Sequence, residues 1–112
     1  MKQKSKPKKI SKAKLDKIFA IQIKDAVQYI CQVCRKRSKF ANAHHILPKR
    51  GYPELRFDVK NLICLCPACH KFAKTSAHNN GVWFTLWLAK NKRETLVYLK
   101  PFLKRSNILI EL

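Results

Sequence analysis

The sequence has few acidic residues and no long apolar run. Of 112 residues, 6 are Asp or Glu against 25 Lys or Arg, so the formal net charge is +19. Such a chain repels itself unless it binds a polyanion, and nucleic acid is the leading partner. An anionic membrane is the other polyanion to consider. No apolar run reaches the roughly 18 residues of a spanning helix, so we expect a soluble protein.

An export signal and a disulfide framework also have no support in the sequence. Lysines open the chain, but no apolar segment follows them as in a signal peptide, and they are not the arginines of a transit peptide. The five cysteines form two C-x-x-C pairs and one single residue. This odd number favours metal binding in a reducing compartment.

The chain is predicted to consist of a basic tail and one domain. Residues 1–13 are polar and rich in lysine, which is typical of a flexible tail. Residues 14–112 are assigned to a single domain. Apolar residues at spacings of three and four predict an amphipathic helix over 14–30 and one or two helices over 80–103, disturbed at the end by Pro101.

The segment 31–75 is expected to form the core of that domain. Short strands are predicted over 40–47, ending at Pro48, and over 62–65, with a loop between them. Pro67 suits the first turn of a helix, which then carries Cys69 and His70 near its start.

Two cysteine pairs predict a structural zinc site. Cys31 and Cys34 form one C-x-x-C turn, and Cys66 and Cys69 form another. Two such turns can complete a closed tetrahedral site with four sulfur ligands, and zinc then contributes directly to folding. The alternative is four buried thiols without a metal, which the repeated spacing disfavours. The remaining Cys64 is interpreted as a packing residue, although it lies close enough to compete for zinc.

Four motifs follow one another along the chain: Cys31-x-x-Cys34, Ala43-His44-His45-Ile46-Leu47-Pro48, Asn61-Leu62, and Leu65-Cys66-x-x-Cys69-His70. This order resembles the HNH endonuclease family with its common zinc-binding cysteines. The resemblance implies an α+β fold, a ββα-metal (HNH/His-Me finger) core with a four-cysteine zinc site and flanking N- and C-terminal helices.

A weaker likeness concerns residues 14–19 and 55–58, which are similar to segments of recombination nucleases from lambdoid phages. It suggests a phage or prophage origin, with a role in phage DNA recombination or processing. We therefore expect the protein in the cytoplasm of a bacterial or phage-infected host cell.

The resemblance also implies the roles of four residues. His44 and His70 would bind the catalytic ion, His45 would be the general base, and Asn61 would hold the loop and fix the tautomer of His45. This matches the chemistry, because phosphodiester hydrolysis needs an activated water and a cation that neutralises developing charge. A histidine suits the base at neutral pH. The implied enzyme is a single-metal DNA endonuclease whose ion stabilises the departing 3′ oxygen.

Two histidines decide which metal ion the site prefers and which residues can be its ligands. Many family members have aspartate where this chain has His44, and imidazole shifts the preference from Mg²⁺ toward Mn²⁺, Ni²⁺ or Zn²⁺. His78 lies eight positions beyond His70, about 12 Å along an ideal helix. It is too far away to share the ion unless the helix is broken.

Basic and aromatic residues are candidates for DNA contacts. Any single lysine or arginine is explained equally well as solvated surface, but together they predict phosphate contacts. The predicted contacts are Arg35, Lys36, Arg37, Lys39, Lys49, Arg50, Arg56, Lys71 and Lys74. Trp83, Phe84 and Trp87 are interpreted as core rather than as base-stacking residues.

The expected partner is duplex or branched DNA, and cutting of both strands favours a homodimer. The alternative function is a non-catalytic zinc module that binds nucleic acid through charge alone.

Overall fold

The computed structural model describes residues 9–105 of the chain. Three helices and two strands follow one another in the order α1 (Lys12–Ala26), β1 (Asn42–His45), β2 (Leu62–Leu65), α2 (Gly81–Asn91) and α3 (Arg93–Leu99). One wide helical turn, Ala68–Phe72, follows β2, and a 3-10 segment, Lys100–Arg105, follows α3. The fold is therefore α+β, as predicted. Most of the expected tail, residues 1–8, lies outside the described residues.

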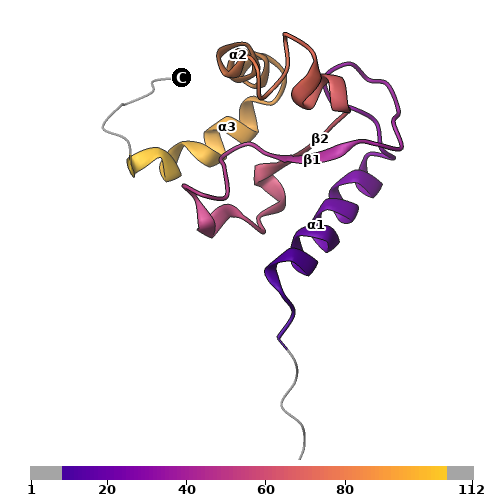
Figure 1. Cartoon of the computed structure of the whole chain (residues 1–112). Helices are drawn as coiled ribbons and strands as arrows, with labels where there is room; N and C mark the ends of the chain where they lie inside the picture. The colour runs from indigo at the N-terminus through magenta and orange to yellow at the C-terminus, as the bar shows by residue number, and fades with distance from the viewer. Residues whose placement is uncertain (1–8, 106–112) are drawn as a thin grey trace, which may run out of the picture.

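The two strands form an antiparallel hairpin with two different faces. Ala43 pairs with Cys64, His44 with Ile63, and His45 with Leu62. Paired residues of an antiparallel hairpin point to the same face, and successive residues point to opposite faces. His44 and His45 therefore belong to different sides of the sheet. In Figure 1 the hairpin lies between α1 and α2, so we call these sides the α1 face and the α2 face.

The core lies on the α2 face. Phe84 and Leu88, one helical turn apart in α2, pack against Ile63 and Leu65 of β2 and against Cys31. The side chains of Phe84 and Leu88 are at most 5% exposed. Trp83 and Trp87 are partly buried against the same cluster, and the ring of Trp87 stacks on that of Phe84. The assignment of these aromatic residues to the core is thus confirmed.

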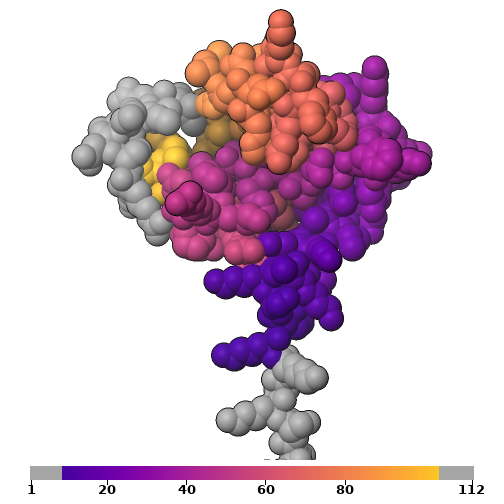
Figure 2. Space-filling view, viewed as in Figure 1, coloured from indigo at the N-terminus to yellow at the C-terminus, as the bar shows by residue number. Residues whose placement is uncertain are grey.

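Helix α1 makes a different kind of contact. None of its residues is buried, and it contacts both strands of the hairpin from the α1 face. Its first part stands away from the body of the molecule (Figure 2), and Ile18 and Ile21 keep about half of their surface exposed, 44% and 50%. No helix within residues 9–105 is long and apolar enough to cross a membrane.

The helix predicted over 14–30 is shorter at its C-terminal end. It begins at Lys12, after Ser11 accepts a hydrogen bond from the backbone N–H of Lys14, and it ends at Ala26. Gln28 and Tyr29 then adopt left-handed backbone conformations, with φ of 54° and 61°. This turn ends the helix and directs the chain into the first cysteine pair. The periodicity of apolar residues alone does not reveal where the helix ends.

The other observed elements differ from the predicted ones mainly in length. The second strand has the predicted bounds, whereas β1 is shorter than the predicted 40–47. The C-terminal helical region is split at Lys92 and continues as a 3-10 segment around Pro101. The helix predicted after Pro67 is only one wide turn, which the backbone hydrogen bond from Ala73 to Ala68 closes.

Candidate functional site

The four paired cysteines meet at one point beside the core. The Sγ atoms of Cys31, Cys34, Cys66 and Cys69 all lie within 4.8 Å of one another. The Sγ atoms of Cys34 and Cys66 are 3.7 Å apart. Sulfurs on a tetrahedron with Zn–S bonds of about 2.3 Å are about 3.8 Å apart. The described cysteines therefore fit a structural Zn²⁺ site.

The backbone explains why the first pair can take this shape. Arg35, just after Cys34, has a left-handed φ of 66°, and its N–H donates to the Cys31 carbonyl. The N–H of Cys31 donates to the carbonyl of Lys36, which closes the turn from the other side. The N–H of Gln32 donates to the Cys64 carbonyl and so joins this turn to β2.

The ionisation of the thiols shows what a cation contributes. Burial, followed by hydrogen bonding with Cys66, raises the pKa of Cys69. Burial also raises the pKa of Cys34. Burial opposes ionisation of Cys31 too, but backbone hydrogen bonds from Cys66 and Cys34 lower its pKa to about 7. Four thiolates this close together need a divalent cation, because without one each disfavours ionisation of its neighbours.

Cys64 does not belong to this cluster. It is 1% exposed, and as the partner of Ala43 it points to the α1 face of the hairpin. Burial raises the pKa of its thiol. Its interpretation as a packing residue is confirmed.

Three histidines form a second cluster on the α2 face. The ring nitrogens of His44, His70 and His78 include one from each residue that all lie within 4.8 Å of one another. The Nε2 atoms of His70 and His78 are 3.0 Å apart, and the centroid of the His44 ring lies 5.0 Å from that of each partner. Nitrogens bound to one tetrahedral ion are about 3.3 Å apart. The three rings therefore fit one transition-metal ion.

The expectation that His78 lies too far from His70 is wrong for this structure. The chain leaves the helical turn after Phe72 and folds back, so that the N–H of His78 donates to the carbonyl of His70. The side-chain amide of Asn79 donates to the carbonyls of Lys71 and Ala73 and holds this return. The break in the helix, which was the stated exception, brings the third imidazole to the cluster.

These imidazoles are held in the form that binds metals. Burial, followed by the charges of His70 and His78, lowers the pKa of His44 to about 3. Burial, followed by the charge of His78, lowers the pKa of His70 to about 4. Burial and then Lys71 lower the pKa of His78. All three rings are therefore neutral at pH 7, and the edge of the His44 ring packs on Phe84 of the core.

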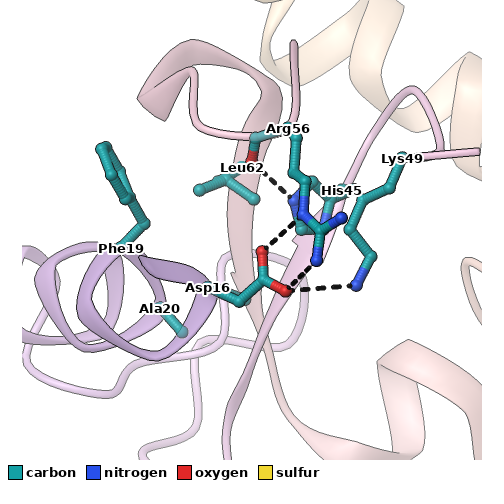
Figure 3. Close-up of a pocket in the computed structure, with 8 residues that line it drawn as sticks. Asp16, Phe19, Ala20, His45, Lys49, Arg56 and Leu62 are labelled. Atoms are coloured by element: carbon teal, nitrogen blue, oxygen red, sulfur yellow. Dashed lines mark hydrogen bonds and ion pairs between the residues drawn. The ribbon is translucent and has the colours of Figure 1, made fainter. Parts of the chain in front are cut away.

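His45 lies apart from this cluster, on the α1 face. It lines a cavity of about 170 Å³ together with Asp16, Lys49 and Arg56. Its Nε2 is 2.9 Å from the carbonyl oxygen of Arg56 (Figure 3). A carbonyl oxygen only accepts, so Nε2 carries the hydrogen, and in the neutral ring Nδ1 is the nitrogen that can take a proton. Within residues 9–105, Nδ1 has no hydrogen-bond partner.

Asn61 holds the loop between the strands. It is fully buried, and its Oδ1 accepts from the N–H of Leu47 while its Nδ2 donates to the carbonyls of Leu47 and Leu55. These bonds join the two ends of the loop. The ring of His45 bonds to the carbonyl of Arg56, one residue beyond Leu55, so Asn61 and His45 bind adjacent carbonyls of the same loop.

The predicted phosphate-contacting residues are exposed, with one exception. Arg56 is half-buried, and its Nε and Nη2 donate to the two oxygens of Asp16 at 3.0 and 2.6 Å. Lys49 also lies within 3.6 Å of Asp16. Sequence reasoning missed Asp16 and the role of His78. Asp16 stands 40 residues from its partner, and the segments of both residues were noted only for their likeness to phage nucleases. His78 was recognised as a metal-binding residue type, but its position in the fold was not known.

The comparison with protein families agrees with this geometry. Residues 31–75 match the family described as HNH endonuclease. The similarity is to an HNH endonuclease domain, and it covers less than half of the chain. The matched segment includes the cysteine cluster, His44, His45, Asn61 and His70, whereas α1 and His78 lie outside it. No curated protein and no solved structure gave a match.

Proposed function

We propose that the protein is a metal-dependent DNA endonuclease that hydrolyses phosphodiester bonds with one divalent ion. The single observation that carries this proposal is the arrangement at the end of β1. There His44 belongs to a cluster of three neutral imidazoles, and the next residue, His45, is held with one ring nitrogen available as a base. Such a division of roles suits hydrolysis of a phosphodiester.

Each of the four histidines has one task in this proposal. His44, His70 and His78 hold the ion, which when bound supplies positive charge for the phosphate and the leaving oxygen. Three protein ligands leave further positions open, as catalytic sites require. His45 takes the proton of the attacking water on Nδ1, while its Nε2–H stays bonded to Arg56. Because His44 and His45 lie on opposite faces of β1, the proposal requires the phosphate to bind at the end of the strand, where the two faces meet.

The donor set favours transition ions over Mg²⁺. Three imidazoles suit Zn²⁺ and Ni²⁺ and also bind Mn²⁺, whereas Mg²⁺ prefers oxygen ligands. The cysteine cluster has the different task of holding a structural Zn²⁺. Cleavage measured with each divalent ion in turn checks this assignment, and a strict requirement for Mg²⁺ contradicts ligation by His44.

The substrate proposed here is duplex or branched DNA. The net charge of +19 and the exposed lysines and arginines support contacts to phosphates, and affinity should fall steeply with added salt. A homodimer would place two such sites on the two strands. A role in phage DNA recombination or processing, in bacterial or phage-infected cytoplasm, completes the proposal and rests on the weaker likeness of residues 14–19 and 55–58.

The competing function is a zinc module that binds nucleic acid through charge without cleaving it. Both functions predict zinc, a basic protein and salt-sensitive binding. The deciding experiment incubates the purified, Mn²⁺-loaded protein with plasmid and with branched DNA. Cleavage that disappears in His45→Ala, with zinc content and folding unchanged, supports the nuclease. Binding without cleavage, for every divalent ion and both substrates, contradicts it.

A further inference from the structure

Helix α1 reaches the His45 side of the site from outside the matched HNH segment. Its residue Asp16 faces the cavity that His45 lines, between Arg56 and Lys49 (Figure 3). The Asp16 carboxylate accepts two parallel hydrogen bonds from the Arg56 guanidinium, and the Lys49 ammonium lies 3.6 Å away. A two-point pair of this kind fixes the direction of the arginine as well as its position.

The arginine that Asp16 holds is also the residue that holds the base. The carbonyl oxygen of Arg56 accepts the hydrogen bond from His45 Nε2. Side chain and backbone of one residue thus connect the helix to the imidazole in three steps: carboxylate to guanidinium, guanidinium to its own backbone, and carbonyl to ring. Fixing the partner of one ring nitrogen selects the tautomer and orients the other nitrogen.

Helix α1 makes a second contact with the same short segment. The ring of Phe19, three residues after Asp16, lies 5.6 Å from that of Phe57, and the Arg56 guanidinium lies over the Phe57 ring at 5.5 Å. From the interior, Asn61 binds the carbonyl of Leu55. Segment 55–57 is therefore held from the interior by Asn61 and from the outside by α1.

Asp16 is one of few acidic residues in a strongly basic chain, and its carboxylate is ionised and mostly shielded from solvent. The chain has only 6 acidic residues against 25 basic ones, and one of the six is placed among cations beside the proposed base. Both side chains of the pair are only 24% exposed. The hydrogen bond from Arg56 holds the pKa of Asp16 below its usual value, so the carboxylate is ionised at neutral pH.

We propose that Asp16 is a positioning residue of the nuclease site, which through Arg56 keeps the His45 ring in the orientation that leaves Nδ1 available. The inference rests on the proposed role of His45. It assigns a function to α1 that the HNH match does not cover. The competing explanation is that the carboxylate occupies the place of a DNA phosphate and must leave before substrate binds.

The test compares Asp16→Asn with Asp25→Asn in the full, Mn²⁺-loaded chain. Asp25 is exposed on the same helix, so the control makes the same chemical change and adds the same charge. We expect Asp16→Asn to lower kcat about tenfold relative to the control, with DNA affinity equal in the two variants. Asp16→Glu should restore part of the rate, and Asp16→Asn should add no further loss in an Arg56→Gln background.

A second readout does not depend on cleavage. In the Zn²⁺-loaded protein, the nitrogen chemical shifts of the His45 ring report which nitrogen carries the hydrogen. We expect the Nε2–H form in the wild type and in Asp25→Asn, and a mixture of forms in Asp16→Asn. If the wild type cleaves nothing, the proposed function fails, yet this measurement still decides whether Asp16 positions the ring.

Two results overturn the inference. One is equal kcat and an unchanged His45 spectrum in Asp16→Asn and its control. The other is faster cleavage or markedly tighter DNA binding in Asp16→Asn, which shows that the carboxylate competes with phosphate. If Asp16→Asn does not fold, Arg56→Lys replaces it, because this variant keeps the charge and the backbone carbonyl but loses the two-point pair. A normal rate and spectrum in Arg56→Lys also overturn the inference.

Discussion

The cysteine cluster and the histidine cluster are built in opposite ways. Each half of the cysteine cluster is local, because two residues separate the members of each pair and one tight turn carries both. The histidine cluster joins a strand, a one-turn helix and the return that follows it. Spacing alone reveals the cysteine site before the fold is known. It does not reveal the histidine site, of which the family resemblance indicated His44 and His70 but not His78.

The two clusters also differ in what they are suited to do. Cys31 is fully buried and belongs to the hydrophobic core, so a metal there joins the first cysteine turn to the residues after β2. His78 is exposed, and the histidine cluster therefore stays open to solvent and to a substrate. We expect the first metal to support the fold and the second to support only the chemistry.

The largest expected effect is loss of the fold when the cysteine site is broken. Cys66→Ser removes one of four ligands, and structural zinc supplies folding free energy directly in small domains. We expect the variant to lose its zinc and its cooperative thermal unfolding, as measured by metal analysis and circular dichroism. The matched change is His70→Gln, which should keep both properties. An unchanged melting curve for Cys66→Ser would remove the distinction between the two sites.

Next in size is the effect of removing the proposed base. His45→Ala should lower the rate of cleavage by about 10²- to 10⁴-fold, which is typical for a general base. Metal content should stay normal, since His45 lies outside the histidine cluster. His45→Gln serves as a second variant, because its amide can still donate to the Arg56 carbonyl but offers no basic nitrogen. Single-turnover cleavage in Mn²⁺ measures both, and near-normal rates in either would reject His45 as the base.

A smaller effect is expected from the ligand that sequence reasoning did not place. His78→Ala leaves His44 and His70 as ligands, so affinity for the second ion should fall by roughly tenfold or more, and cleavage should recover at high metal concentration. Titration with Mn²⁺ while Zn²⁺ fills the cysteine site measures this. The neighbouring exposed change Asn79→Ala loosens the same return without removing a ligand. If it weakens binding as much as His78→Ala does, the loop and not the imidazole is responsible.

The sequence predicted the parts of this molecule whose information is local. The second strand and the four-cysteine site follow from residue pattern and paired spacing, the family resemblance implied the α+β class, and each is found in the structure. The end of α1 was misplaced because left-handed conformations at Gln28 and Tyr29 leave no periodic signal. Contacts across long separations, such as Asp16 with Arg56, depend on how the loop and helix pack, and no spacing rule encodes them.

The smallest expected effect belongs to the cysteine that resembles a ligand in sequence only. Cys64 is buried on the α1 face and stands outside the cluster, so Cys64→Ala should leave zinc content and cleavage unchanged. Loss of the sulfur from a packed position should cost about 1 kcal/mol of unfolding free energy. Chemical denaturation with parallel zinc analysis measures both quantities. Zinc loss in Cys64→Ala would mean that the metal exchanges among five thiols. The contrast between the cysteine cluster, defined by sequence spacing, and the histidine cluster, assembled by the fold, would then be weaker than the geometry indicates.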